Sequence, residues 1–545
     1  MIIDDQHYDI IIVGTGAGGG TLAQKLAPTG KRILVLERGD RMPLEEQNRA
    51  NVDVFQKGRY RSPEQWYDTE GEPFSPQMNY AVGGNTKIYN ATLMRMRERD
   101  FEAVTYQDGI TPEWPIKYAD WEPYYTQAEQ LYQVHGDQQS DPTEPAHSQA
   151  YPYSAIDHPK LMEPIVKLIK AEGLHPTSLP TSLTRREDDP SGDAEVFGID
   201  LALKYDNVTL RTAALVTALH TNPSGTEIKA VQAEIRIDAQ TDAQTDAQTN
   251  AQTGTGAAAD TEIQRETFLF TADIVVLACG AVNSAALMLD SANEKHPDGL
   301  ANGSSMLGRN LMKHLMTVII ERDATKNDGT FIPSISVNDY YWGDQRGYYD
   351  YPMGHIENSG GLLQDLIFAE SPPLLSVLAR FLPDEGLTRL AKRSIGWWAH
   401  TGVLPNPNNR VYWQTKSRYG RPKKKLRYEF TPNNLEAHDR LVYRWMGVLK
   451  DMENTGQELR QSTVYPRGES PIQVTGYQCG TARMGTDPAT SVLDLNCRTH
   501  EIDNLYVVDS SFFPSCASVS PALTVMANAL RVGEHLIERV GGSQR

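Results

Sequence analysis

The sequence predicts an α/β protein with a Rossmann-like parallel sheet flanked by helices and a second region with a mixed or antiparallel sheet covered by helices. Three observations lead to this prediction. The apolar run at residues 8–13 precedes a glycine-rich turn and a helical stretch, the pattern of a buried parallel strand. The same order of strand, small-residue turn and helix returns at residues 272–292. From 311 to 470 the chain is rich in aromatic residues and proline, which suits a mixed sheet with short helices.

Length and composition describe a large folded protein. The chain has 545 residues, 39% of them hydrophobic, enough for a sizeable core in two or more domains. Its 52 basic and 70 acidic residues give a net charge of −18, which argues against a nucleic-acid partner and against charge-driven membrane anchoring. The N-terminus has no signal-peptide pattern, and no apolar run reaches about 18 residues. We therefore expect a cytoplasmic protein with no transmembrane segment.

Cysteine usage agrees with a reducing compartment. A chain of this length with four cysteines has too few for a disulfide scaffold, and their spacing is not that of paired metal ligands. The sequence therefore predicts no metal site. The four are Cys279, Cys479, Cys497 and Cys516.

A βαβ unit occupies the N-terminus. The strand at 8–13 is followed by the helical stretch "TLAQKLAPTG" and by a second apolar strand in "KRILVLERGD". Gly14, Gly16 and Gly19 between strand and helix satisfy G-x-G-x-x-G, which permits a tight turn, close approach of a pyrophosphate and close helix packing. Glu37 ends the second strand, where an acid accepts hydrogen bonds from a ribose. Together these features predict a dinucleotide site, with FAD and NAD both open at this point.

Two segments have unusual composition. Residues 238–260 repeat small polar residues that cannot bury enough apolar surface to order themselves, so we expect a disordered loop tip. The alternating segments on either side of it predict two strands and a hairpin-like excursion from the first sheet. The stretch 361–398 is rich in Leu, Phe and Trp and is interpreted as core, with a lid or a membrane-skimming helix as alternatives.

Two further segments suit close contact with a ligand. Between residues 78 and 104, a double glycine is followed by Asn85 and Thr86; a structural turn is the alternative there. Near the C-terminus, the strand "NLYVVD" ends at Asp509 and "SPALTVMANAL" opens a helix. One face of this helix carries Leu523, Met526 and Leu530.

These motifs resemble those of the glucose-methanol-choline (GMC) oxidoreductases, which bind FAD. The resemblance follows the family's order over nearly the whole chain, and it implies an FAD-binding domain and a substrate-binding domain. The FAD-binding domain would combine residues 1–110, 195–310 and 471–545, and the substrate-binding domain residues 111–194 and 311–470. The matching pieces are "DIIIVGTGAGGG" with Glu37, "VGGNTKIYNA", "GITPEWPIKYADWEPYYTQAEQLYQV", "VVLACGAVNSA", "GRNLMKH", "NPNNRV" and the C-terminal segment from "GTARMG" onward.

The resemblance also assigns cofactor-binding residues. It places the glycine turn at the FAD pyrophosphate and Glu37 at the adenosine ribose. The helix that starts at Pro521 would direct its N-terminus toward the flavin, where it favours the negative charge of the reduced form. No histidine occurs in "YAVGGNTKIYNA", so we expect non-covalent FAD. The further cofactor-binding residues are Gly83, Gly84, Asn85, Thr86, Val216, Asp509 and Pro521.

The catalytic positions depart from the family pattern. Most members have a histidine before the "GT" of the C-terminal segment and a histidine or asparagine before the proline of the last helix; here these places hold Tyr477 and Ser520. A base with a pKa of about 6 to 7 is well matched to removing an alcohol proton, whereas tyrosine titrates near 10. Tyr477 would need a lowered pKa, or would act as an acid or a positioning hydroxyl. An active-site wall and plain packing are the alternatives.

Neighbouring residues add further candidates. Ser520 before Pro521 also suits an ordinary helix N-terminus. Gln478 supplies an amide, and Cys479 is interpreted as a small buried hydrophobe. His314 and His400 are possible bases, although neither falls where the resemblance expects one.

We therefore expect an FAD-dependent oxidoreductase that oxidises a CH–OH group of an alcohol, sugar or related small molecule by hydride transfer to flavin N5. Its catalytic-site residues would be Tyr477, Ser520 and Gln478. One alternative is other flavin chemistry, as in a lyase, isomerase or photodecarboxylase. The other is an FAD-binding protein without turnover. Substrate identity and electron acceptor stay open.

Overall fold

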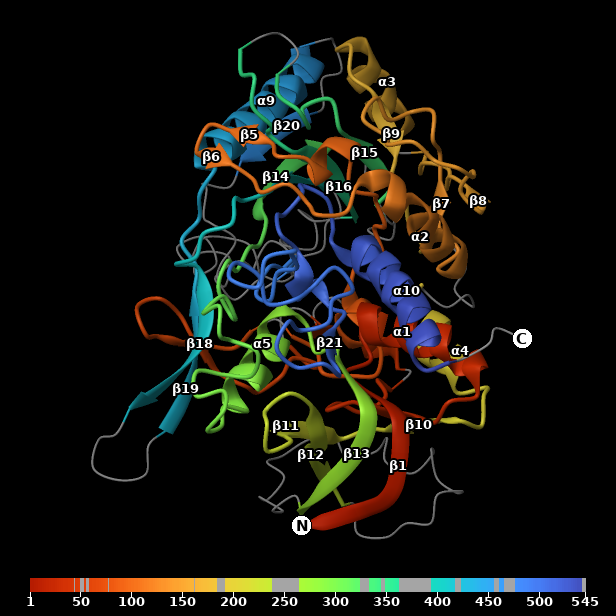
Figure 1. The fold of residues 1–545 in the computed structure, drawn as a ribbon. Helices are drawn as coiled ribbons and strands as arrows, with labels where there is room; N and C mark the ends of the chain where they lie inside the picture. The colour runs from red at the N-terminus through yellow and green to blue at the C-terminus, as the bar shows by residue number, and fades with distance from the viewer. Residues whose placement is uncertain are drawn as a thin grey trace, which may run out of the picture.

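The computed structural model shows a mixed α/β protein, and two large sheets lie toward opposite ends of the molecule with α10 (Ala522–Arg539) between them (Figure 1). This confirms the predicted fold class. The repeat at 238–260 and most of the stretch 361–398 lie outside the described residues. The structure describes residues 1–43, 45–49, 53–54, 58–76, 78–160, 162–183, 192–237, 264–323, 333–344, 348–361, 394–416, 423–454, 460–464 and 476–541.

The first sheet collects strands from the beginning, middle and end of the chain. Its order is β10-β2-β1-β13-β12-β11, and β21 also pairs with β13. Strands β10, β2, β1, β13 and β21 run parallel, whereas β11 and β12 add antiparallel pairs. The segments flanking the repeat, β12 and β13, pair antiparallel as predicted. The seven strands are β1 (Ile2–Val13), β2 (Ile33–Leu36), β10 (Val208–Arg211), β11 (Ala214–Thr221), β12 (Ile228–Arg236), β13 (Arg265–Leu277) and β21 (Leu505–Val507).

The central strand β1 begins earlier than its apolar run. Ile10, Ile11 and Ile12 are fully buried, because helices and neighbouring strands cover both sides of the sheet. Residues 2–7 are largely exposed, yet Ile2 and Ile3 still pair with β13. The prediction from buried residues alone therefore found the C-terminal half of the strand and missed its solvent-facing start.

Helices on this sheet follow the glycine turns. α1 (Ala17–Leu26) lies between β1 and β2, and α5 (Ala281–Asp290) follows β13. α1 packs against α10, and α10 packs against α2 (Tyr118–Leu131) (Figure 1). The predicted apolar face of α10 is buried through Leu523, Met526 and Leu530.

The second sheet is antiparallel throughout, in the order β20-β14-β17-β16-β15-β9. Helices α3 (Glu163–Ala171) and α9 (Leu435–Asn454) share a hydrophobic core with it. Trp397 of β17 meets Trp445 of α9 edge to face, with ring centroids 4.8 Å apart. The strands are β9 (Pro176–Ser178), β14 (Leu315–Asp323), β15 (Ile335–Val337), β16 (His355–Gly361), β17 (Ser394–Thr401) and β20 (Arg460–Val464).

Smaller elements connect the two sheets. A four-stranded sheet in the order β18-β19-β3-β4 joins an N-terminal segment to residues 410–429, and Trp66 stacks on Tyr428 within it. Its strands are β3 (Trp66–Tyr67), β4 (Pro73–Phe74), β18 (Arg410–Lys416) and β19 (Lys423–Glu429). Two short pairs are β5 (Thr105–Tyr106) with β6 (Gly109–Ile110), and β7 (His135–Gly136) with β8 (Tyr153–Ser154). The short helical turns are η1 (Ala27–Thr29), η2 (Glu46–Arg49), η4 (Gly84–Ile88), η5 (Glu98–Phe101), η6 (Glu195–Ile199), α4 (Asp200–Ala202) and η7 (Ser510–Phe512).

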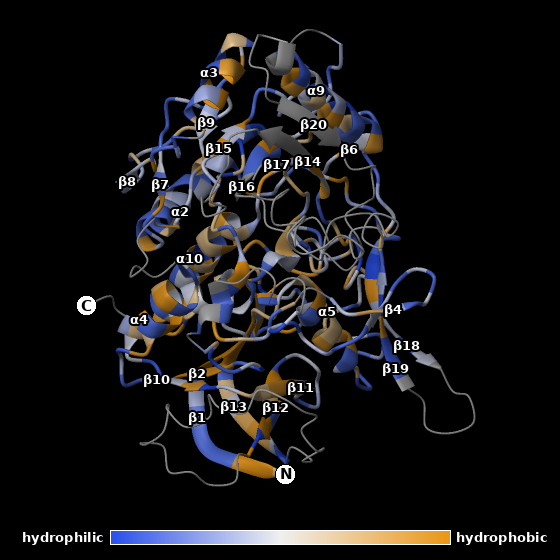
Figure 2. Ribbon diagram, turned by 180° about the vertical axis from the view of Figure 1, so that it is seen from behind, coloured by the Kyte–Doolittle hydropathy of each residue, from blue (hydrophilic) through white to orange (hydrophobic). Residues whose placement is uncertain are grey.

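Hydropathy follows burial in this architecture. Hydrophobic residues dominate β2 and much of α10, whereas α9 carries both hydrophobic and hydrophilic residues (Figure 2). Within the described part of the chain, no helix combines the length and the apolar character that crossing a membrane requires.

Candidate functional site

A cavity of about 860 Å³ lies at the carboxyl ends of the parallel strands. Val13 ends β1, Leu36 ends β2, Ala278 follows β13 and Asp509 follows β21, and all four line the cavity. Open α/β sheets bind ligands at this edge, and the volume is in the range of pockets that enclose a large organic ligand. The fold therefore assembles one site from three distant parts of the sequence.

The glycines of the first turn have different tasks. Gly14 has φ +101°, and a Cβ there would lie 2.4 Å from the carbonyl oxygen of Ala278. A Cβ on Gly19 would lie 2.0 Å from the carbonyl oxygen of Gly14, so Gly19 permits close helix packing and is not among the cavity-lining residues. A Cβ on Gly16 would meet no protein atom within 4 Å, and Gly16 faces the cavity. Only Gly16 of these three keeps space open for a ligand.

The second glycine pair lies directly against the first turn. Gly84 has φ +57°, and a Cβ there would approach the Cα of Gly16 to 3.1 Å. The amide of Gly83 donates to Thr15 Oγ1 over 3.0 Å. Gly84, Asn85 and Thr86 line the cavity, whereas Gly83 is not among the lining residues. Gly83 therefore joins the two turns and does not face the cavity.

Glu37 lines the cavity with its carboxylate already held in place. Oε2 accepts hydrogen bonds from the amide and hydroxyl of Thr15, and Oε1 accepts one from the amide of Gly39. Burial raises the pKa of Glu37, although these hydrogen bonds oppose the shift. Oε1 keeps acceptor capacity for a ribose hydroxyl.

Asp509 organises the part of the cavity wall next to the first glycine turn. Its Oδ2 accepts from Ser284 Oγ and from the amide of Gly280, and its Oδ1 accepts from the amide and hydroxyl of Ser511. Asp509 thus ties the start of α5 to the turn after β21. Pro521 and Val216 also line the cavity.

Tyr477, Gln478 and Ser520 line this same cavity. The Tyr477 backbone has φ +60°, a region that few non-glycine residues occupy. No acceptor among the described residues pairs with the buried Gln478 Nε2. Ser520 Oγ accepts from the amide of Ala522 over 3.4 Å, so it contacts the first turn of α10, which begins at Ala522 and not at Pro521.

The fold also brings two distant histidines to Tyr477. The ring of His314 stacks on Tyr477 at 4.7 Å between centroids, and His400 meets it edge to face at 5.6 Å. His314 precedes β14 and His400 lies on β17, so the pairing of these strands sets the cluster. The sequence showed both histidines, but no local pattern indicated that they meet Tyr477.

Two of the cysteines near the site, Cys279 and Cys479, are structural in character. All four cysteines are free, and burial raises the pKa of the Cys479 thiol. Cys279 lines the cavity, but its thiol donates to the carbonyl of Val13 over 3.3 Å. Burial raises the pKa of this thiol to about 12.

The residues present fit a bound dinucleotide. Gly16 leaves open space at the N-terminus of α1, where backbone N–H groups lack intrahelical partners and favour a phosphate. Glu37 and the beginning of α10 border the same cavity. Fold and site together define a protein of the dinucleotide-binding class.

Comparisons with known proteins find similar oxidoreductases. Residues 405–529 match the family model for GMC oxidoreductases. The 6'''-hydroxyparomomycin C oxidase of Streptomyces lividus is 26% identical over 99% of this chain and 93% of its own length. The fructose dehydrogenase large subunit of Gluconobacter japonicus is 24% identical over 97% of each chain.

Solved structures agree on the fold. Pyridoxine 4-oxidase from Mesorbium loti superposes with a TM-score of 0.67 at 17% identity, covering 98% of this chain and 99% of that chain. Formate oxidase from Aspergillus oryzae (R554A variant) gives 0.68 at 16% identity with the same coverage. The chain is therefore similar to the GMC oxidoreductases in its C-terminal part and shares a fold with solved oxidases over nearly its whole length, and this similarity implies FAD as the cofactor.

Proposed function

We propose that the protein oxidises a CH–OH group of a sugar or related alcohol with FAD held non-covalently in the 860 Å³ cavity. The carrying observation is that one cavity contains both the dinucleotide features, Gly16 and Glu37, and the polar side chains Tyr477, Gln478 and Ser520. Such co-location is what transfer between a cofactor and a small substrate requires.

The cofactor site divides into three parts. The turn at Gly14 and Gly16 would hold the pyrophosphate, and Glu37 would bind the adenosine ribose. The segment around Asn85 and the residue Pro521 would contact the flavin. Bound there, FAD supplies a hydride acceptor. Asp509 acts through the backbone that it braces, because its four donors already occupy its carboxylate.

Two observations support non-covalent binding. No histidine is among the described residues that line the cavity. The Cys279 thiol is engaged with the Val13 carbonyl and its pKa is high, so it is a poor nucleophile. Among the described residues that line the cavity, neither a histidine nor a reactive Cys279 thiol is therefore presented to the flavin.

The two domains would have separate roles in binding the cofactor and the substrate. Residues 1–110, 195–310 and 471–545 would hold the cofactor, and 111–194 with 311–470 would cover the substrate. The short sheet that joins Trp66 to Tyr428 crosses this division, and it would brace the two domains against each other.

The polar side chains of Tyr477, Gln478 and Ser520 would orient the substrate. Oxidation of the alcohol to a carbonyl removes a hydride from carbon and a proton from oxygen. Gln478 Nε2 would donate a hydrogen bond to the substrate oxygen. The hydroxyl oxygens of Tyr477 and Ser520 would accept a hydrogen bond from the substrate hydroxyl, and its proton would be released to solvent water as the hydride leaves carbon. A tyrosine with its usual pKa near 10 orients such a proton better than it removes it.

The proposed substrate class is supported by the names of three of the relatives. Their names describe an oxidase of 6'''-hydroxyparomomycin C, an oxidase of paromamine and a dehydrogenase of fructose. These names favour a polyhydroxylated substrate and redox chemistry over a lyase, isomerase or photodecarboxylase reaction.

Matched substrate pairs test this proposal. Each sugar or amino sugar is mixed anaerobically with the purified protein beside its deoxy analogue, which lacks one hydroxyl. We expect flavin reduction by at least one parent sugar and none by its deoxy partner. Reduction by both members of every active pair would contradict oxidation at that hydroxyl.

A further inference from the structure

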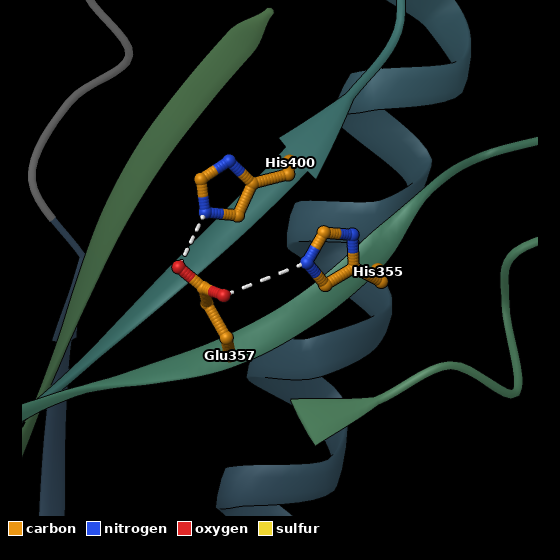
Figure 3. A group of neighbouring side chains, drawn as sticks. All are labelled: His355, Glu357 and His400. Atoms are coloured by element: carbon orange, nitrogen blue, oxygen red, sulfur yellow. Dashed lines mark hydrogen bonds and ion pairs between the residues drawn. The ribbon is translucent and has the colours of Figure 1, made fainter. Parts of the chain in front are cut away.

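Three side chains with metal-binding atoms converge on the second sheet, apart from the residues that line the cavity. His355 and Glu357 lie two residues apart on β16, so they project from the same face of the strand. His400 lies on β17 directly opposite His355 in the antiparallel register. Figure 3 shows the three side chains pointing toward one another, with both imidazoles directed at the carboxylate.

The distances suit one shared ion. Nε2 of His400 is 3.2 Å from Oε1 of Glu357, and Nε2 of His355 is 3.7 Å from Oε2. The ligand atoms of the three residues all lie within 4.8 Å of one another. Tetrahedral zinc with bonds of about 2.1 Å separates its ligand atoms by about 3.4 Å, so the two measured distances bracket the required value.

The burial and the charge of these three side chains also suit a bound cation. The side chains of His355, Glu357 and His400 are 3%, 2% and 2% exposed. A buried carboxylate is costly unless it is paired, and within the described part of the chain its ion-pair partners are these two histidines. The contact to His355 exceeds ordinary hydrogen-bond length, so of the two contacts only the one to His400 is a hydrogen bond of ordinary length. A divalent cation placed among the three side chains would add positive charge and could contact all three groups.

We propose that His355, Glu357 and His400 bind one divalent transition-metal ion, with zinc the best match. Two imidazole nitrogens and one carboxylate oxygen form a common zinc donor set that leaves the fourth position open for water. Because His400 also contacts Tyr477, the ion would lie directly behind a wall of the cavity. The proposal holds whether or not that cavity oxidises an alcohol.

Metal content of the full chain with its bound cofactor tests the proposal. The wild type, Glu357→Gln and His355→Gln are produced in zinc-supplemented medium, desalted, and analysed by inductively coupled plasma mass spectrometry. His438→Gln is the matched control, because His438 is a buried histidine that bonds Thr317 and Thr401. Zinc is then added to chelator-stripped wild type and Glu357→Gln, and the midpoint of thermal unfolding is measured.

We expect about one zinc per wild-type and His438→Gln chain, and at least a tenfold loss in the other two variants. Added zinc should raise the unfolding temperature of the stripped wild type and leave that of Glu357→Gln unchanged. Wild type without zinc, or equal zinc in wild type and Glu357→Gln, would overturn the proposal in favour of an ion-free hydrogen-bonded cluster.

If the variants do not fold, a measurement on the wild type alone tests the proposed metal site. Zinc in wild-type crystals is located by anomalous diffraction at the zinc absorption edge. A peak between His355, Glu357 and His400 supports the site, and a peak elsewhere overturns it.

Discussion

The ring of Tyr477 stacks on the ring of His314, with centroids 4.7 Å and planes 14° apart. Tyr477 holds this place with φ +60°, a conformation that costs a non-glycine residue free energy and persists only where surrounding contacts enforce it. Strained residues of this kind concentrate at ligand sites. The stack therefore fixes a hydroxyl-bearing ring as one wall of the cavity.

Tyr477→Phe keeps the stack and removes the hydroxyl. If the hydroxyl orients the substrate, kcat/KM should fall about tenfold, the value of one lost hydrogen bond, while FAD content stays constant. Steady-state kinetics with a substrate that reduces the flavin measures this, and Tyr348→Phe at an exposed tyrosine is the control. Unchanged kcat/KM in Tyr477→Phe would reduce the role of Tyr477 to packing.

Tyr477→His should raise the rate of alcohol oxidation. An imidazole titrates near 6.5 and removes an alcohol proton more readily than a phenol does, an advantage of about 10 to 100-fold. Histidine is also among the residues that tolerate positive φ. The measurement is kcat against pH, which should rise through the imidazole pKa. An unaltered rate and profile would mean that position 477 does not reach the reacting hydroxyl.

Gly16→Val should abolish FAD binding. The new side chain would enter the cavity, because no protein atom lies within 4 Å of a Cβ at this position. Gly447→Val is the matched control, since a Cβ there also meets no atom but lies on α9, away from the cavity-lining residues. We expect FAD per chain to fall at least about tenfold in Gly16→Val alone. Normal FAD content would show that Gly16 does not face the pyrophosphate.

Asp100 gives the protein a distinct pH dependence. Burial raises its pKa to about 6, although Tyr341 and the Arg97 amide donate hydrogen bonds to it. The ordinary value is 3.8. A raised folded-state pKa favours the protonated form, so its stabilising contribution is complete below pH 3.8 and is lost as pH rises through 6.

Wild type should therefore lose stability relative to Asp100→Asn between these two pH values, by roughly 2 to 3 kcal/mol. Denaturant unfolding of both proteins at several pH values measures the difference. A difference that is constant with pH would contradict the raised pKa.

The elements that could be predicted from the sequence are those that have a local sequence pattern. The run at 8–13, the glycine turn and the segment that became α1 could each be interpreted from neighbouring residues, because buried parallel strands and helix-opening glycines have local signatures. The strand flanks of the repeat were predicted for the same reason. The exposed start of β1 was missed because its polar residues do not carry that signature.

Contacts between residues far apart in the chain could not be predicted from the sequence. Gly84 touches Gly16, and His314 meets Tyr477, through contacts that span 68 and 163 positions. His355 and Glu357 stand at alternate positions, which is a usable signal that they share a face. Their partner His400 depends on how β16 pairs with β17, and nothing in either strand alone specifies that pairing.

The most direct test of the central claim is an anaerobic absorbance measurement on the purified wild type with a panel of sugars, amino sugars and simple alcohols. We expect a yellow protein that releases its FAD on denaturation and loses the visible absorbance of oxidised flavin when a suitable CH–OH substrate is added. A colourless protein, or a yellow one whose flavin no member of the panel reduces, would contradict it.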